Sequence, residues 1–312
     1  MAHQIETMFY TRQPAWHGLG VRVTEALTSQ EALTISGLDW SVGQQPIYTE
    51  QGQLIPNYKA NVRNNDNSIL GVVSDRYTIV QNNEAFEFTD NLLGEGVRYE
   101  TAGSLQSGRR VWLLAKLPEK YIINGEKIEP YLVFSNSHDG STAINVAMTP
   151  IRVVCQNTLN LALRQAKRSW SAKHVGNMQS KLHEAQETLE LAHGYMAELG
   201  KEIDSLNKIK LSDSKVMDFI HNELAPMPDN ATAIQKRNVS QIREDMVVRF
   251  FEAPDLRLLP KTAYRLINAI SDSVTHATPI RNTANYQENL FIKTLEGHPL
   301  IDKAHNLVRT AA

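Results

Sequence analysis

The sequence has a single cysteine, Cys155, and it lacks any apolar run that approaches the length of a membrane-spanning helix. One cysteine excludes an internal disulfide and a cysteine-rich zinc site, and it is typical of proteins from a reducing cytoplasm. The first residues lack the basic and apolar stretches of a signal peptide. We therefore expect a cytoplasmic protein that does not insert into a membrane.

An excess of charge of one sign is also missing. The chain has 32 Lys and Arg against 34 Asp and Glu, which gives a formal net charge of −2. Such a chain has no overall attraction to nucleic acid or to a membrane surface, so either partner would require a local patch of charge. The content of 42% hydrophobic and 21% charged residues is typical of a folded globular protein.

The common metal and nucleotide motifs are absent as well. The ten histidines are scattered, and none forms a His-Glu-x-x-His motif. There is no Walker A sequence, and the Trp-His-Gly-Leu-Gly stretch at 16–20 is not followed by a helical pattern that could bind a phosphate. We expect neither a metal nor another cofactor.

The pattern of apolar and polar residues changes near residue 175. Before it, short runs rich in β-branched residues alternate with Gly, Asn and Asp, a pattern typical of strands and turns. A turn is predicted at Asn64–Asn67, and hairpins are predicted at 107–108 and 124–125. A short helix is predicted that is capped by Asn82 or Asn83 and stops at Gly94. The sequence predicts an α+β fold: an antiparallel sheet with packed helices over residues 1–175, and a helical region over 176–312 that is either a separate domain or packed on that core.

From Asn157 to Ser171 the period becomes helical. One predicted side is apolar and carries Leu159, Leu163, Ala166 and Trp170. The opposite side is polar and basic, with Asn157, Asn160, Arg164, Lys167, Arg168 and Ser171. We therefore expect an amphipathic helix with a basic outer face.

A heptad-like seam follows. Its apolar residues alternate steps of three and four: Leu182, Ala185, Leu189, Ala192, Met196, Leu199, Ile203 and Leu206. Packing against later helices of the same chain is favoured over an intermolecular coiled coil. Further helices are predicted over 214–224, 232–251 and 261–275, and two short ones around 297–299.

A nucleophilic site is one interpretation of the segment that surrounds the cysteine. Cys155 with His138, Asp139 and Asn157 are residue types that can activate a thiol. However, Cys155 ends a strand-like run, where a free cysteine is usually buried, and Asp139-Gly140 is a good tight turn. A structural role for these residues is favoured over an enzyme that depends on Cys155.

A basic patch is the strongest functional signal. There is no Asp or Glu from Gly140 to His183, whereas this window has six Lys and Arg residues. Cations on one surface bind phosphates and release counterions, and a nearby aromatic ring can stack on a base; Trp112 and Tyr99 are candidates beside Arg109 and Arg110. The predicted nucleic-acid-binding residues are Arg109, Arg110, Arg152, Arg164, Lys167, Arg168 and Lys173. The alternative is a solvated helix face.

Several motifs resemble a known family. The stretches Asn-Ser-His-Asp-Gly-Ser at 136–141 and Arg-Val-Val-Cys-Gln-Asn-Thr at 152–158, with Asp-Arg-Tyr-Thr-Ile-Val-Gln-Asn-Asn at 75–83, resemble the phage/plasmid-like protein family of unknown function. This resemblance implies a bacterial host cell and a mobile-element setting, and it supplies no catalytic residue. The order of hairpins, strand and basic helix is loosely similar to RecT-like single-strand annealing recombinases.

These observations favour a non-enzymatic protein that binds nucleic acid, with single-stranded DNA as the favoured ligand. We expect it to act in annealing or recombination as a homo-oligomer. A phage-encoded interaction protein that blocks or decoys a host defence protein is the alternative, and an enzyme based on Cys155 is less favoured.

Overall fold

The computed structural model describes residues 5–11, 20–94, 97–117, 121–123, 125–152, 168–190, 193–276 and 298–310. The strands in these ranges are β1 (Ile5–Tyr10), β2 (Val21–Arg22), β3 (Val42–Tyr48), β4 (Leu54–Arg63), β5 (Ile69–Ser74), β6 (Arg98–Leu105), β7 (Arg110–Lys116), β8 (Tyr121–Ile123), β9 (Glu126–Ser137), β10 (Ile144–Arg152) and β11 (Ser169–Ala172). The helices are α1 (Ser29–Ile35), α2 (Asn82–Leu93), α3 (Met178–Glu190), α4 (His193–Lys208), α5 (Asp213–Asp218), the π-helix η1 (Phe219–Leu224), α6 (Ala233–Glu252), α7 (Ala263–His276) and α9 (Pro299–Thr310). Strands are mostly N-terminal and helices mostly C-terminal, so the predicted α+β class is confirmed.

The chain divides into two compact units. Unit 1 comprises Met1–Glu119, Pro130–Met148 and Lys167–His193, and unit 2 comprises Lys120–Glu129, Thr149–Ala166 and Gly194–Ala312. No helix within the described ranges combines the length and the apolar character that crossing a bilayer requires.

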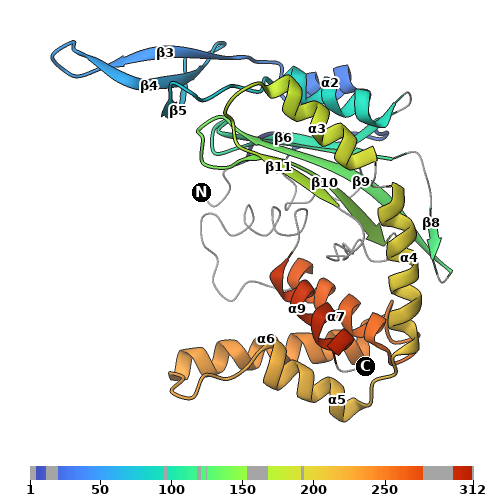
Figure 1. Cartoon of the computed structure of the whole chain (residues 1–312). Helices are drawn as coiled ribbons and strands as arrows, with labels where there is room; N and C mark the ends of the chain where they lie inside the picture. The colour runs from blue at the N-terminus through green and yellow to red at the C-terminus, as the bar shows by residue number, and fades with distance from the viewer. Residues whose placement is uncertain are drawn as a thin grey trace. The chain divides into compact units, whose positions relative to one another are not determined.

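Unit 1 is built on a large sheet with the strand order β11-β10-β9-β7-β6-β1-β2. The predicted hairpin of β6 and β7 is antiparallel, with Leu105 opposite Arg110, and β7 continues into β9 with Arg110 opposite Ser137. The second predicted hairpin is also present, because β8 pairs with the first residues of β9. Helices α2 and α3 lie over one face of this sheet (Figure 1).

Helix α2 shows how local sequence fixes these elements. Gln81, rather than Asn82 or Asn83, is the residue at its N-cap, and the backbone N–H of Gln81 donates to the carboxylate of Glu84 at 2.7 Å. Gly94 ends the helix with φ of 78°, as predicted. Asn82 is thereby turned inward, where it is 2% exposed.

A second, three-stranded sheet of unit 1 has the order β3-β4-β5. We call it the arm, because its β3–β4 hairpin projects beyond the large sheet and the helices above it (Figure 1). The turn Asn64–Asn67 joins β4 to β5, as the Asn-Asn-Asp-Asn sequence predicts. Several large apolar side chains of the arm are exposed: Tyr48, Leu54, Tyr58, Ile69 and Val72.

Unit 2 is mainly helical. Helix α6 packs on α7 and α7 packs on α9. The seam predicted over 182–206 falls on two helices, α3 and α4, and its residues in α4 are buried: Met196, Leu199, Ile203 and Leu206. Glu202 of α4 bonds to His305 of α9 at 2.7 Å, so α4 meets a later helix of the same chain, as favoured.

The prediction that a helix continues to Ser171 is wrong. Residues 169–172 form strand β11, which pairs antiparallel with Ile144–Ala147 of β10. Trp170 lies opposite Val146 and is 7% exposed, whereas Ser169 and Ser171 are exposed. This alternation has the period of a strand, and the indole gains more by burial in the sheet than one further helical turn would provide. Residues 153–167 lie outside the described residues.

Candidate nucleic-acid interface

The Asn-Ser-His-Asp-Gly motif ends strand β9 in a buried polar cluster. His138 is 0% exposed, and its Nε2 lies 3.0 Å from Oδ1 of Asn82. Its backbone carbonyl accepts a bond of 2.6 Å from Nδ2 of Asn61, which comes from β4 of the arm. His138 therefore connects the arm, helix α2 and the large sheet, and only Asp139-Gly140 forms the exposed turn that was predicted.

The proton of the His138 ring can be assigned from its neighbours. Nδ2 of Asn82 donates to the carbonyls of Leu38 at 3.0 Å and of Trp40 at 3.2 Å, so Oδ1 of Asn82 faces the ring as an acceptor. Nε2 of His138 must then be the protonated nitrogen. Burial lowers the pKa of His138 to about 3, so the ring is neutral near pH 7.

Tyr77 and His174 extend this cluster on the side of β11. The Tyr77 hydroxyl donates to the carbonyl of Ser137 at 2.5 Å, and its ring stacks on His174 with centroids 4.6 Å apart. Backbone N–H of Thr78 bonds to the carbonyl of His174 at 2.9 Å. Burial raises the pKa of Tyr77 and lowers that of His174, so both side chains are uncharged. We call Asn61, Tyr77, Asn82, His138 and His174 the hub.

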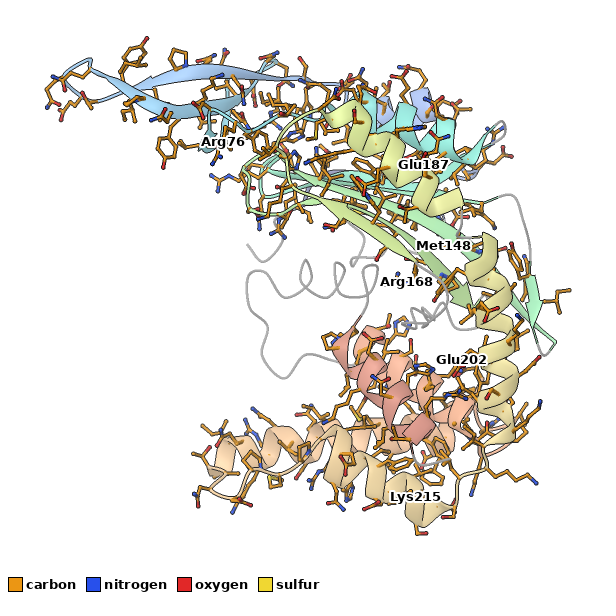
Figure 2. The ribbon with its side chains drawn as sticks, in the orientation of Figure 1. Arg76, Met148, Arg168, Glu187, Glu202 and Lys215 are labelled. Carbon is orange, nitrogen blue, oxygen red and sulfur yellow. The ribbon has the colours of Figure 1, made fainter. Side chains whose placement is uncertain are left out.

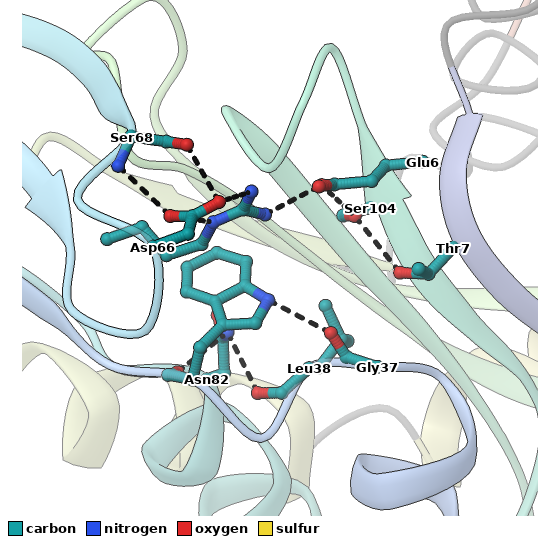
Figure 3. Close-up of polar contacts among 10 residues, drawn as sticks. Glu6, Thr7, Gly37, Leu38, Asp66, Ser68, Asn82 and Ser104 are labelled. Atoms are coloured by element: carbon teal, nitrogen blue, oxygen red, sulfur yellow. Dashed lines mark hydrogen bonds and ion pairs between the residues drawn. The ribbon is translucent and has the colours of Figure 1, made fainter.

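A charged cluster fixes the base of the arm beside the hub. Arg63 donates to Glu6 at 2.7 Å and to Asp66 at 2.5 Å, and its guanidinium lies 5.3 Å from the centre of the Trp40 ring. Asp66 also accepts bonds from the backbone and hydroxyl of Ser68 (Figure 3). The bond from Arg63 is the main reason that the pKa of Asp66 is lowered.

The turn between β6 and β7 presents two of the predicted cations. Its backbone has positive φ at Gln106, Ser107 and Gly108, with values of 55°, 57° and 83°. Arg109 follows this tight turn and is exposed, and its carbonyl accepts the N–H of His138 at 2.7 Å. Arg110 begins β7 and is half-buried. The hub thus holds the backbone of Arg109 in place while its side chain stays at the surface.

Two further exposed cations adjoin the hub. Lys173, which was predicted, precedes His174, and Arg76, which was not, precedes Tyr77. Arg76 lies where the arm meets the large sheet (Figure 2). Neither these two nor Arg109 forms an ion pair with any residue that the structure describes. We call Arg76, Arg109 and Lys173 the basic rim. Arg76 belongs to the Asp-Arg-Tyr-Thr-Ile-Val motif, which is the only signal that could have marked it.

Of the other predicted cations, Arg168 lies at the end of β11 away from Lys173. Nη1 of Arg168 donates to the carbonyl of Met148 at 2.9 Å, so this side chain contacts the backbone of β10 (Figure 2). Arg152 is the last residue of β10, and its side chain lies outside the described part, as do Arg164 and Lys167. Since residue 168 precedes a strand, one helical face cannot carry Arg168 and Ser171 together.

The aromatic residues expected to stack on bases are buried. Trp112 is 2% exposed and Tyr99 is 0% exposed, because both point into the core from the β6–β7 hairpin. Tyr58 is 52% exposed instead, and it lies opposite Ser74, two residues before Arg76. The exposed ring beside the basic rim therefore comes from the arm, which the sequence pattern did not single out.

The alternative of a nucleophilic site receives no support from the hub. The His138 ring is enclosed and is a weak base, whereas a general base needs access to its substrate and a pKa nearer to the working pH. Cys155 and Asn157 lie outside the described residues. Across the described ranges, no three His, Cys, Asp or Glu side chains come together as a metal site would require.

Comparison with known proteins gives a family and no activity. Residues 69–292 match the model of a family described as a domain of unknown function, DUF932, which is well over half of the chain. The chain belongs to the DUF932 family. No curated protein and no solved structure matches it. Within the DUF932 match lie all of the basic rim and every hub residue except Asn61.

Proposed function

We propose that this chain is a non-enzymatic protein that binds single-stranded DNA and acts as a homo-oligomer in annealing or recombination. The carrying observation is the basic rim. Three exposed cations from three separate loops adjoin one rigid, buried hub at one end of the large sheet. The hub fixes the backbone beside these cations, so only their side chains must become ordered when they contact phosphates.

The local charge determines the character of this binding. Asp75 precedes Arg76 in the chain, and Asp139 follows His138 of the hub, so these two carboxylates moderate the positive potential of the basic rim. Backbone contacts of this kind are independent of base sequence and weaken as salt is added. The exposed ring of Tyr58 offers a stacking surface for an unpaired base, which favours a single strand over a duplex.

The motif resemblance sets the biological context of the proposal. The Asn-Ser-His-Asp-Gly-Ser motif and its companions resemble phage/plasmid-like proteins, which favours a role in a phage or plasmid within a bacterial cytoplasm. The looser similarity to RecT-like annealing proteins rests on the order of elements alone and is an analogy of fold.

Charge reversal tests the proposal. Arg109→Glu combined with Lys173→Glu should weaken binding of a labelled single-stranded oligonucleotide by at least about tenfold, since two phosphate contacts become repulsive. Fluorescence anisotropy at low salt measures the dissociation constant. Circular dichroism and thermal unfolding check that the variant is folded.

Arg22→Glu combined with Arg98→Glu is the matched control. Both residues are exposed in unit 1, and Arg98 lies at the end of β6 away from the turn that holds Arg109. This double variant carries the same charge change and should bind as the wild type does. Equal loss in both variants, or no binding by the wild type, would contradict the proposal. A nuclease-resistant, stoichiometric complex with a host protein would instead favour the interaction protein.

A further inference from the structure

The two edges of the arm differ in how they are protected. At the β3 edge, the amide of Gln81 imitates a neighbouring strand: its Oε1 accepts the N–H of Val42 and its Nε2 donates to the carbonyl of Val42, both at 2.9 Å. Pro46, further along β3, has no N–H to offer. Both devices prevent another strand from adding at this edge.

No residue that the structure describes protects the β5 edge in this way. The backbone N–H of Asp75 bonds to the carbonyl of Asn57 at 2.9 Å, which fixes the alternation along the β4–β5 ladder. By that alternation Gly71 and Val73 direct their backbone groups toward β4, and Val72 directs its N–H and carbonyl outward. The strand Ile-Leu-Gly-Val-Val-Ser contains neither a proline nor a charge.

The side chains at this edge are apolar and exposed. Val72 is 55% exposed and Ile69 is 65% exposed. Both are paired with residues of β4 that share one face of the arm, Val72 with Ala60 and Ile69 with Val62. A strand added at β5 would therefore gain backbone hydrogen bonds and an apolar neighbour at the same time.

We propose that β5 pairs antiparallel with β5 of a second copy of this chain, centred near Val72, so that two arms form one continuous sheet. The charged residues that flank β5 favour a second copy of this chain, paired antiparallel, as the partner strand. Antiparallel pairing sets Arg76, just after β5, against the partner's Asp66–Ser68 turn just before it, where Asp66 binds its own Arg63 and keeps 40% of its side chain exposed. Parallel pairing would set Arg76 against Arg76 and Asp75 against Asp75. Because β5 itself has no charged residue, two copies of this strand can pair without electrostatic repulsion between their side chains.

This inference names the surface through which the proposed homo-oligomer assembles. It rests on the homo-oligomer of the proposed function and not on DNA binding. It predicts a two-fold, isologous contact, because the same strand serves on both sides. The arms are then the joined parts. Arg109 and Lys173 of each copy stay outside the contact, and Arg76 lies at its border.

Val72→Lys is the decisive variant. A lysine on each copy would face its counterpart across the seam, so the wild type should have the mass of a dimer by light scattering and the variant that of a monomer at the same concentration. Val21→Lys is the matched control, since Val21 is 54% exposed on β2, the last strand of the large sheet. This control should remain a dimer.

A cross-link locates the contact. With Val72→Cys, a short bis-maleimide should give a covalent dimer, because residues opposite each other in an antiparallel pair lie only about 5 Å apart at Cβ. Val21→Cys and the wild type, whose only cysteine is Cys155, supply the background. A wild type that is monomeric at all concentrations, or a dimer that survives Val72→Lys without a cross-link at residue 72, overturns the inference.

The same samples separate this inference from DNA binding. The folded Val72→Lys monomer should still bind a short single-stranded oligonucleotide, because the basic rim is unchanged. A wild-type dimer that binds no DNA would refute the proposed function and leave the paired arms standing. A monomer that binds DNA would refute the paired arms and the homo-oligomer, and it would leave single-strand binding by the basic rim standing.

Discussion

Nε2 of His138 lies 3.0 Å from Oδ1 of Asn82, and this contact joins the end of β9 to the start of α2 inside the core. Both side chains are almost fully buried, at 0% and 2% exposed. Since Asn82 also donates to the carbonyls of Leu38 and Trp40, it links α2 to two separate segments. The hub is therefore a structural joint, and the surface that we assign to function is the basic rim beside it.

The buried neutral His138 predicts that stability falls in mild acid. Its pKa is about 3 in the folded protein, below the value of about 6.5 in the unfolded chain, so the unfolded state takes up the proton first. Stability should be constant above about pH 7 and should fall by about 2 kcal/mol at pH 5 from this residue alone. The lowered pKa of His174 acts in the same direction. Urea unfolding at pH 5 and pH 7.5 measures the difference.

His138→Gln separates this effect from other acid-sensitive groups. Glutamine cannot titrate, so the variant should lose less stability between pH 7.5 and pH 5 than the wild type, although it starts from a lower value. Identical pH slopes for the two proteins would show that His138 does not titrate in the way described.

Asn82→Ala should destabilise the fold by about 2 to 4 kcal/mol, because it leaves a buried ring N–H and two carbonyls without their partner. Asn83→Ala is the neighbouring control: this residue is exposed on the same helix, and its loss should cost less than about 0.5 kcal/mol. Chemical denaturation of both variants provides the comparison. Equal costs would mean that the hub contributes nothing specific.

Gly71 of β5 marks a close approach between the arm and the hub. A Cβ at this position would lie 2.6 Å from Cα of Asp139, a backbone atom that cannot move aside easily. Gly71→Ala should cost about 1 to 3 kcal/mol. Gly194→Ala, in α4 with nothing within 4 Å, should stabilise by up to about 1 kcal/mol. Thermal unfolding should move in opposite directions for the two variants, and the same direction would refute the geometry.

In unit 2, Arg265 holds a set of backbone carbonyls at the end of α6. It is 4% exposed and donates to Phe250 and Leu259, each at 2.8 Å, with its guanidinium 4.8 Å from the Phe250 ring centre. Arg265→Met should cost about 3 kcal/mol, since those carbonyls stay buried without a donor. Arg257→Met, at an exposed position, should be near neutral. Calorimetry of the two variants tests this, and a mild effect at Arg265 would contradict its role.

The sequence predicted the elements that depend on local chemistry. The turns at 64–67 and 107–108, the stop at Gly94 and the helix that begins after Thr232 all appear, because caps and turn residues act within a few positions of themselves. The α+β class followed from the change near residue 175 from strand-like to helical patterns of apolar residues. These signals need no knowledge of distant contacts.

The surface could not be predicted in the same way. The helical period that groups Arg168 with Ser171 is overridden by the pairing of Trp170 with Val146, a contact between distant segments. The Tyr77–His174 stack and the bridge between Tyr77 and Val175 bring the segments of Arg76 and Lys173 together, and no spacing in the sequence encodes that pairing. Trp112 and Tyr99 looked suitable beside Arg109, but strand alternation turns both into the core.

The salt dependence of single-strand binding tests the central claim most directly. The dissociation constant of the wild type for a labelled oligonucleotide should be measured as potassium chloride rises from about 50 to 200 mM. Contacts by the three rim cations predict a logarithmic slope with a magnitude of about 2, since each phosphate contact on a single strand contributes about 0.7. The Arg109→Glu, Lys173→Glu variant should bind weakly at every salt concentration. Absence of binding by the wild type at the lowest salt, or a dissociation constant that salt does not change, would contradict the account.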